Sequence, residues 1–279
     1  MTCETCEVAD MIGLSLKLTL AGVEDYWEDV DRWVRNQFVE NQLTSVDWVD
    51  KLSAEAFQNS PVFDFDLFSS RVLEEKPVEA WESTDIERAI GAFAGQALPN
   101  DWGMGSSHYC CTGNAGRTLY WIWDSILTKE DDKVQVNLLL NRASPWLDVD
   151  SHLPYEGQVE LKIKEAKEVA VRIPEWTNRQ KVSCKVNGQA QEFSWSGNYV
   201  EVRNLKGGDT VSVEFPMREK TFFQVISGFP YKLTLKGNTV VDIDPKGKIN
   251  PIYQRDQYKQ EKAPLKKVIR FVSRETILW

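Results

Sequence analysis

The spacing of apolar residues changes near residue 130, and this change constrains the fold more than any other feature of the sequence. Before it, residues 7–20 and 23–39 carry apolar side chains three and four positions apart or on nearly every side, which is typical of helices. After it, apolar and polar residues alternate in short segments divided by turn signals such as Asn187-Gly188. The sequence therefore predicts a multidomain α and β protein, in which a helical part precedes an antiparallel β-sandwich with one wet face on each sheet.

The helical part is predicted to contain further helices. Short helical pieces are expected around Val46–Phe57, and Thr84 followed by Glu87 fits the capping box of a helix that opens at Ser83. Another helix is expected over Gly113–Leu127. Some of these helices are apolar on nearly every side and cannot easily cover one another. We therefore expect that this part lacks a larger partner structure, and that its exposed apolar faces favour self-association.

The β part consists of segments of alternating polarity about ten residues apart. The expected strands begin near Val134, Val159, Val169, Val200, Val211, Tyr231 and Thr239. The charged stretch 259–267 is expected to be a loop. Three regions follow: the C-terminal part of a helical domain over 1–130, a β-sandwich domain over 131–218, and further strands of the sandwich region with a charged tail over 219–279.

Composition and charge exclude several classes of protein. The chain has 33 basic and 42 acidic residues and a net charge of −9, whereas a general nucleic-acid binder needs clustered basic residues. No apolar stretch approaches the roughly 20 residues that span a bilayer. We therefore expect neither a nucleic-acid nor a membrane partner. No signal peptide is visible at the N-terminus.

The cysteines suggest chemistry, because four of the five fall into two tight pairs. They are Cys3, Cys6, Cys110, Cys111 and Cys184. From the residues alone, three interpretations stay open: a metal site such as a four-cysteine zinc site, a redox pair or vicinal disulfide, and buried inert thiols. Glu4 and His108 stand beside the pairs and are also competent metal ligands. A cysteine at a helix N-terminus also has a lowered pKa, which favours a nucleophilic thiolate.

Two ordered sets of residues carry a resemblance to a known family. The first is Glu4-x-Cys6 on an apolar helix, followed about 100 residues later by Cys110-Cys111-x-x-Asn114. The second set lies in the β part and comprises Val171-Arg-Ile-Pro-Glu-Trp, Val186-Asn-Gly, Asn198-Tyr-Val, Gly208-Asp-Thr-Val and Phe215-Pro-Met. In the residues of each motif and in the order of the motifs, both sets resemble glycoside hydrolase family 127, the β-L-arabinofuranosidase family, formerly a domain of unknown function.

The resemblance implies a catalytic (α/α)6 helical barrel followed by β-sandwich domains. It implies that Zn²⁺ is held by Glu4, Cys6, Cys110 and Cys111. Cys110 would be the nucleophile that attacks the anomeric carbon of a furanoside and forms a covalent thioglycosyl intermediate, which water then releases with retention. The implied substrates are terminal arabinofuranosides or similar sugars of plant-type glycans.

The sequence departs from the family at its start. The family's proposed general acid/base is a glutamate that precedes the E-x-C motif, and only three residues precede Glu4 here. We therefore expect a C-terminal portion of such an enzyme, lacking this glutamate and the first part of the barrel, with little or no glycosidase activity alone. Any signal peptide would belong to the missing part, so the localisation is left open between cytoplasm and periplasm. The alternative is a non-catalytic carbohydrate-binding or structural β-sandwich module with a vestigial or partner-dependent helical part.

Further substrate contacts are expected from residues in the loops near the cysteine pair. His108 precedes the pair by two positions and is a candidate substrate contact. Trp102 is a second candidate, because sugar sites use the faces of aromatic rings. His152 and Cys184 lie in the β part and are expected to be structural.

Overall fold

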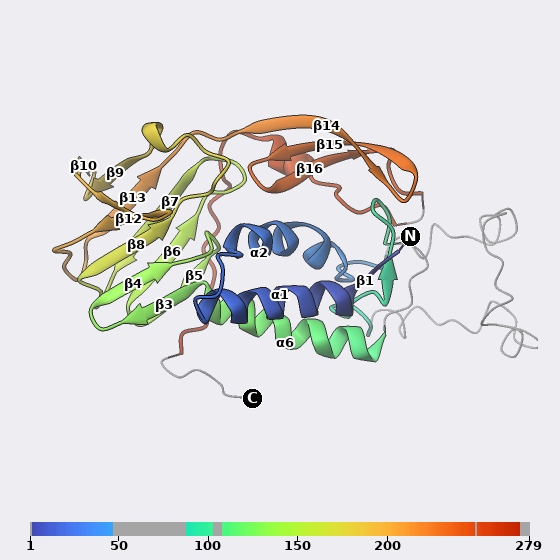
Figure 1. The fold of residues 1–279 in the computed structure, drawn as a ribbon, viewed down its shortest axis with the longest axis horizontal. Coiled ribbons are helices and arrows are strands. Elements are labelled where there is room, and N and C mark those ends of the chain that lie inside the picture. The colour runs from blue at the N-terminus through green and yellow to red at the C-terminus, as the bar shows by residue number, and fades with distance from the viewer. Residues whose placement is uncertain (1, 47–87, 103–107, 249, 274–279) are drawn as a thin grey trace, which may run out of the picture.

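The computed structural model describes residues 2–46, 88–102, 108–248 and 250–273. The helical pieces expected around Val46–Phe57, apart from Val46 itself, and the capping box of Thr84 and Glu87 lie outside the described residues. Figure 1 shows a β-sandwich at one end of the molecule, a layer of helices beyond it, and a second β region lying over the helices.

The helices follow the predicted positions closely. The described α-helices are α1 (Thr5–Leu20), α2 (Trp27–Trp33) and α6 (Tyr109–Ser125), and α2 continues into the π-helix η1 (Val34–Phe38). Each buries one stripe of apolar side chains, among them Ile12, Val30 and Ile122. The partial (α/α)6 barrel stays a prediction. No described helix is long and apolar enough to cross a membrane.

The sandwich consists of a six-stranded and a five-stranded sheet. The first has the order β10-β9-β13-β7-β6-β5 and the second the order β11-β12-β8-β4-β3. Their bounds are β3 (Leu127–Glu130), β4 (Lys133–Val136), β5 (Arg142–Ala143), β6 (Leu147–Ser151), β7 (Gln158–Ile163), β8 (Glu168–Arg172), β9 (Ser183–Val186), β10 (Gln189–Ala190), β11 (Ser194–Ser196), β12 (Tyr199–Val202) and β13 (Thr210–Glu214). A short 3-10 helix, η4 (Arg179–Lys181), precedes β9.

The predicted alternation places the sandwich core correctly. On β7, for example, Val159, Leu161 and Ile163 are buried, whereas Lys162 between them is exposed. The expectation of a wholly antiparallel sandwich is wrong in one place, because β4 and β8 pair in parallel, with Val134 opposite Val169. The chain leaves β4, forms β5–β7 in the other sheet and returns as β8, and this crossover brings both strands into the sheet in the same direction.

The C-terminal strands form a sheet of their own. Strands β14 (Glu219–Ile226), β15 (Phe229–Lys236) and β16 (Thr239–Asp244) pair only with one another among the described residues. Beyond the 3-10 helix η5 (Asp256–Lys259), residues 260–273 contain neither helix nor strand, so the charged stretch is a loop as expected. The boundaries of the three expected regions stay a prediction.

The three-stranded sheet is joined to the helices through Asn36 in the π-helix. Its side chain donates to the carbonyl oxygen of Asn238 and accepts from the backbone N–H of Val240, both at 2.8 Å. The buried Arg255 adds an ion pair with Glu40, at 2.6 Å between Nε and Oε1. The irregular helix therefore gives β16 a place to dock.

Helix α2 is joined to the sandwich by a buried ion pair. Arg172 of β8 is 4% exposed, and its Nη1 lies 2.9 Å from Oε2 of Glu28. Asn238 completes the contact by donating to Glu28 at 2.8 Å and to Asp31 at 2.9 Å. The face of β8 that carries Ala170 and Arg172 is buried here, although alternation predicts a wet face, and Arg172 at its end pairs with Glu28 of α2.

The outer side of the helix layer keeps apolar side chains open to solvent. Met11 and Leu14 of α1 are 48% and 60% exposed, and Leu119 of α6 is 40% exposed. The exposure agrees with the apolar pattern of these helices, and self-association through this face stays a prediction.

Replacing Arg172 by methionine is expected to lower the free energy of unfolding by about 3–5 kcal/mol, because Glu28 would be left buried without its cation. Urea unfolding followed by circular dichroism measures the change. Glu175→Gln is the matched control, since this second partner of Arg172 is exposed and surface pairs contribute only about 0–1 kcal/mol. Equal effects of the two variants would contradict the importance of the buried pair.

Candidate metal centre

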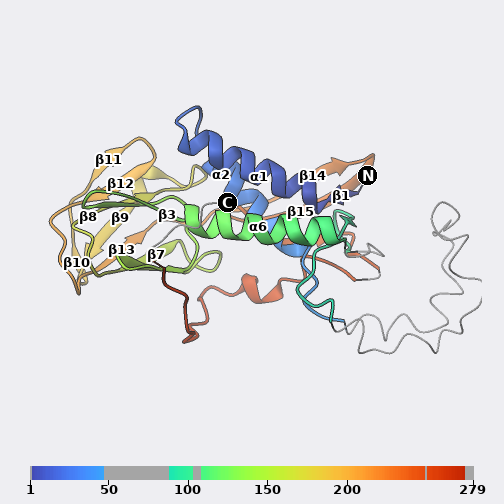
Figure 2. The ribbon, with the colours of Figure 1, turned by 90° about the horizontal axis from the view of Figure 1, so that it is seen from below.

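Helices α1 and α6 lie side by side and run in the same direction, so their N-termini meet at one end of the molecule (Figures 1 and 2). The contact is close because small residues line it: Ala9 and Ala115 are fully buried. A Cβ atom added to Gly13 would lie only 2.6 Å from the ring of Trp121. Thr118 adds a hydrogen bond from its hydroxyl to the Ala9 carbonyl, at 3.5 Å.

A short strand pair positions the residues just before α1. Strand β1 (Cys3–Glu4) pairs with β2 (Gln96–Ala97), so that Glu4 lies opposite Gln96. The Thr5 hydroxyl then donates to the carbonyl oxygen of Ala94. Glu4 is thereby fixed at the N-terminus of α1, beside the start of α6.

Three thiols from the two helix N-termini come together. The Sγ atoms of Cys6 and Cys111 are 3.2 Å apart, and those of Cys110 and Cys111 are 3.9 Å apart. All three sulfurs lie within 4.8 Å of one another. Oε1 of Glu4 lies 3.9 Å from Sγ of Cys111. Residues 105 positions apart in the sequence thus form one cluster of potential ligands.

The cluster has the dimensions of a zinc site. Sulfur ligands about 2.3 Å from a tetrahedral zinc ion lie roughly 3.8 Å from one another. The 3.9 Å separation of Cys110 from Cys111 matches this value, whereas the 3.2 Å separation of Cys6 from Cys111 is clearly shorter. The Glu4 oxygen lies 3.9 Å from Sγ of Cys111, which is close enough for a small movement to bring both onto one ion. Three thiolates and one carboxylate are also a donor set that Zn²⁺ accepts. These residues fit the ion.

The other two cysteines take no part in this cluster. Among the described residues, the group that meets the geometric criterion for a metal ion contains neither Cys3 nor Cys184. Cys3 is partly buried against the main core, and Cys184 is buried on β9 in the sandwich. Glu4 lies outside this three-residue group as well, although its Oε1 is 3.9 Å from Sγ of Cys111. The choice between Glu4 and Cys3 as a fourth ligand therefore stays a prediction.

The thiols of the cluster differ in exposure and acidity. Cys110 is exposed, whereas Cys111 is buried. Burial, followed by the hydrogen bond to Cys111, raises the pKa of the Cys6 thiol to about 12, although a hydrogen bond from Asn114 acts in the opposite direction. Burial also raises the pKa of Cys111. Without a cation, the two inner thiols are therefore protonated at neutral pH, and Cys110 is the sulfur that an external molecule can reach.

The two expected substrate contacts lie in different surroundings. His108 is exposed at the N-cap position of α6, and its ring lies so close to Gly95 that a Cβ atom there would be 2.3 Å from Nδ1. Trp102 is only 4% exposed, and its indole N–H donates to the Asn41 carbonyl at 2.9 Å. Little of the Trp102 ring is therefore open to a sugar. A substrate role for either residue stays a prediction.

Asp10 is a site neighbour that the sequence did not predict. It lies one helical turn after Cys6, just as Asn114 lies one turn after Cys110. The two side chains meet across the helix pair, at 3.0 Å from Nδ2 of Asn114 to Oδ1 of Asp10. The shared spacing of four residues from each cysteine could have identified this pair once the cysteines were placed together.

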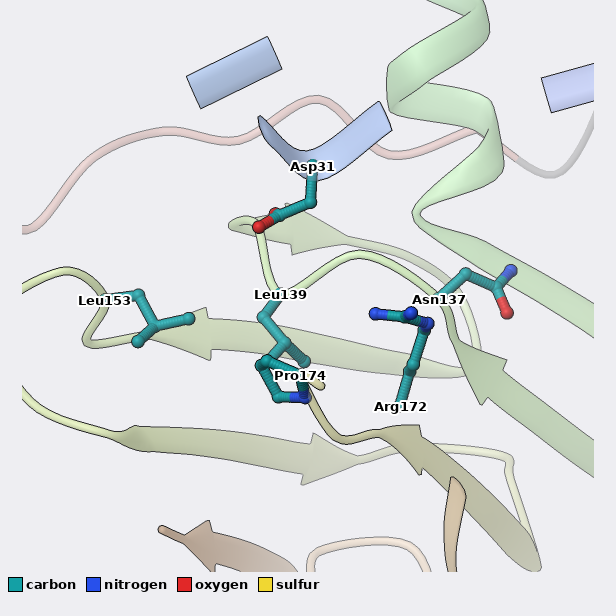
Figure 3. Close-up of a pocket in the computed structure, with 6 residues that line it drawn as sticks. All are labelled: Asp31, Asn137, Leu139, Leu153, Arg172 and Pro174. Atoms are coloured by element: carbon teal, nitrogen blue, oxygen red, sulfur yellow. The ribbon is translucent and has the colours of Figure 1, made fainter. Parts of the chain in front are cut away.

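A cavity at the junction of α2 and the sandwich is a separate feature (Figure 3). Its lining includes Asp31, Leu139 and Arg172, and its volume is about 10 Å³. A volume of this size is that of one water molecule, so the cavity cannot admit a sugar. The cluster at the helix N-termini is the better candidate for function.

Comparisons with known proteins relate the chain to one family. The profile described as "Beta-L-arabinofuranosidase, GH127 middle domain" matches residues 133–217. The fold is similar to a GH127 β-L-arabinofuranosidase from Geobacillus stearothermophilus, with a TM-score of 0.52 and 15% identity over 86% of this chain and 36% of that one. It is also similar to another GH127 β-arabinofuranosidase, with a TM-score of 0.57 and 19% identity over 86% of this chain and 37% of that one. A comparison with curated proteins gave no match.

Alkylation of the metal-free chain with iodoacetamide is expected to modify Cys110 first, because it is exposed, and Cys6 much more slowly. The rate at Cys6 should rise about tenfold per pH unit up to its pKa of about 12, since only the thiolate reacts. Peptide mass spectrometry at several pH values measures both rates. Cys184, whose pKa burial raises to about 11, is the internal control, and fast labelling of Cys6 at pH 7 would contradict the geometry.

Proposed function

We propose that this chain, whose residues 133–217 match the GH127 middle domain, belongs to glycoside hydrolase family 127, and that its thiol cluster is the zinc-binding and nucleophilic part of a retaining β-L-arabinofuranosidase-like active site. Glu4, Cys6, Cys110 and Cys111 hold Zn²⁺ in this proposal. The observation that carries it is the cluster itself, in which three sulfurs lie within 4.8 Å of one another and the Glu4 carboxylate lies 3.9 Å from one of them.

The proposal concerns part of a larger enzyme. The chain spans 36–37% of the length of the family structures to which it is similar. A saccharide substrate of the arabinofuranoside type is inferred from the family, and the complete active site would include groups beyond the four ligands. The residues of this chain account for the nucleophile and its environment.

Exposure supports Cys110 as the nucleophile in this proposal. Cys110 is the thiol of the cluster that is open to solvent, whereas Cys111 is buried and Cys6 is partly buried. When bound, zinc supplies the positive charge that keeps its thiol ligands deprotonated at neutral pH. Glu4, Cys6 and Cys111 then orient the centre, and the Cys110 sulfur faces the incoming sugar.

The reaction proceeds in two displacements. The Cys110 thiolate attacks the anomeric carbon, a C–S bond forms, and the bond from that carbon to the leaving oxygen breaks as a general acid protonates this oxygen. Water then attacks the same carbon, the C–S bond breaks, and the electron pair returns to the Cys110 sulfur while a base takes the proton from water. Two inversions give overall retention. Most retaining glycosidases use a carboxylate where this site uses a thiolate.

The chain, purified under reducing conditions without added metal or a polyhistidine tag, is expected to hold about one zinc ion. Cys110→Ala and Glu4→Gln should each reduce the zinc content strongly, because each removes one of four ligands. Elemental analysis by mass spectrometry measures the zinc content. Cys3→Ser is the matched control and should keep its zinc, since Cys3 lies outside the cluster.

Other outcomes would replace the proposal. Loss of zinc in Cys3→Ser but not in Glu4→Gln would favour a four-cysteine site of another class of protein. Absence of zinc, together with binding of an arabinofuranoside that survives Cys110→Ala, would favour the non-catalytic module.

Zinc affinity is expected to increase with pH between about 6 and 9, because the inner thiols have raised pKa values and must lose their protons to bind the metal. Chelator competition at each pH measures the dissociation constant, and a pH indicator measures the protons released. An affinity that does not change with pH would mean that thiolates are not the ligands.

A further inference from the structure

A polar cluster lies directly behind the thiols, on the same side of the helix pair. Asn114 of α6 donates from Nδ2 to Oδ1 of Asp10 on α1, at 3.0 Å. Arg117 donates to Oδ1 of Asn114. The guanidinium of Arg117 also lies 3.6 Å from Asp10. Asn114 thus uses both ends of its amide, one toward each helix, and it also hydrogen-bonds the Cys6 thiol.

The spacing relates this cluster to the thiol centre. Asp10 follows Cys6 by four residues, and Asn114 follows Cys110 by four residues. Four residues are about one turn of an α-helix, or roughly 5.4 Å along the axis. The amide bridge therefore joins α1 and α6 one turn behind the place where their sulfurs meet.

We propose that Asn114 is a positioning residue for the thiol centre, which sets the axial register of α1 against α6 by bridging Asp10 and Arg117. This inference rests on the proposed function. A slide of one helix by a single residue is about 1.5 Å, which is a large fraction of the 3.2–3.9 Å between the thiol sulfurs. Register between the helices therefore decides whether the sulfurs can share one ion.

The neighbouring contacts show why an amide is required at this position. Asn114 must donate to a carboxylate and accept from a guanidinium, and among uncharged side chains of this length only an amide does both. Arg117 is held in place on its other side by the ring of Trp121, 4.5 Å from its guanidinium carbon. Trp121 in turn packs against Gly13 of α1, so closely that a Cβ atom there would lie 2.6 Å from its ring.

These contacts are exposed, so we expect them to fix the position of the helices and to add little to the free energy of unfolding. The side chains of Asp10 and Arg117 are 66% and 44% exposed, and exposed ion pairs add little to the stability of a fold. Removing the bridge should therefore weaken metal binding with little effect on the urea midpoint. If Asn114 only stabilised the packing of the two helices, its removal would lower the urea midpoint and leave metal binding unchanged.

The test exchanges the two partners. Asn114→Asp places two carboxylates face to face and is expected to raise the zinc dissociation constant by about 10–100-fold. The double variant Asp10→Asn/Asn114→Asp restores a donor opposite an acceptor, with Arg117 still able to donate to residue 114. It should return the constant to within about threefold of the unchanged chain. Chelator competition measures all three constants, and the thiolate charge-transfer band of the Co²⁺-loaded chain reports the geometry independently.

Thr118→Val is the matched control, because it removes another hydrogen bond between the same helices away from the amide bridge. It should leave the dissociation constant within about threefold. If Asn114→Asp lowers the urea midpoint, Asp10→Leu takes its place. This variant removes only the acceptor on α1, and it should weaken zinc binding to a similar extent.

Two results would overturn the inference, and they differ from failure of the proposed function. An unchanged dissociation constant in Asn114→Asp, or no recovery in the double variant, would show that Asn114 does not set the register, while the zinc site itself would stand. A chain that binds neither Zn²⁺ nor Co²⁺ would overturn the proposed function and this inference together.

Discussion

The rest of the structure depends on the parallel contact between α1 and α6. Each helix begins with cysteines, but the two starts are about a hundred residues apart in the sequence. Only the close approach of the helix surfaces, with Gly13 against Trp121 and two buried alanines beside it, brings the sulfurs within reach of one another. Parallel packing also directs the positive ends of both helix dipoles at the thiols, which favours thiolate and carboxylate charge at that end. The site is therefore a consequence of helix packing more than of any loop.

The β structure holds this helix pair in place from the side. The buried pair of Arg172 and Glu28 ties α2 to the sandwich, and Asn238 ties the three-stranded sheet to the same carboxylate. Charges of this kind are costly to bury, and they are retained where they specify one arrangement over others. In this chain they link the sandwich and the three-stranded sheet to α2. The sandwich therefore contacts the helix layer that carries the proposed ligands, although its own strands contribute none of them.

Much of the fold could be predicted because periodicity reflects burial directly. Alternation identified β7 and β13, spacings of three and four identified α2 with η1, and runs rich in apolar residues identified α1 and α6. The pairing of β4 with β8 could not be predicted, because strand direction depends on a crossover between sheets. The dry outer face of β8 was missed for a similar reason, since a buried Arg172 looks like a polar residue on a wet face until its partner on α2 is known.

The candidate site was predictable in its cysteines and not in their surroundings. Residue types marked the cysteine pairs as potential ligands, with Glu4 and His108 beside them, and the resemblance selected Glu4, Cys6, Cys110 and Cys111 from this set. Asp10 carries no signal of its own, because a lone aspartate on a helix is usually solvated. Its place beside the site becomes visible only in the structure, where Asn114 of α6 donates a hydrogen bond to it.

The most direct test of the central claim is the zinc-edge X-ray absorption spectrum of the chain loaded with one equivalent of Zn²⁺. The account predicts three sulfur ligands at about 2.3 Å and one oxygen ligand at about 2.0–2.2 Å, the oxygen being lost in Glu4→Gln. A shell of four sulfurs, or one of oxygen and nitrogen alone, would contradict it.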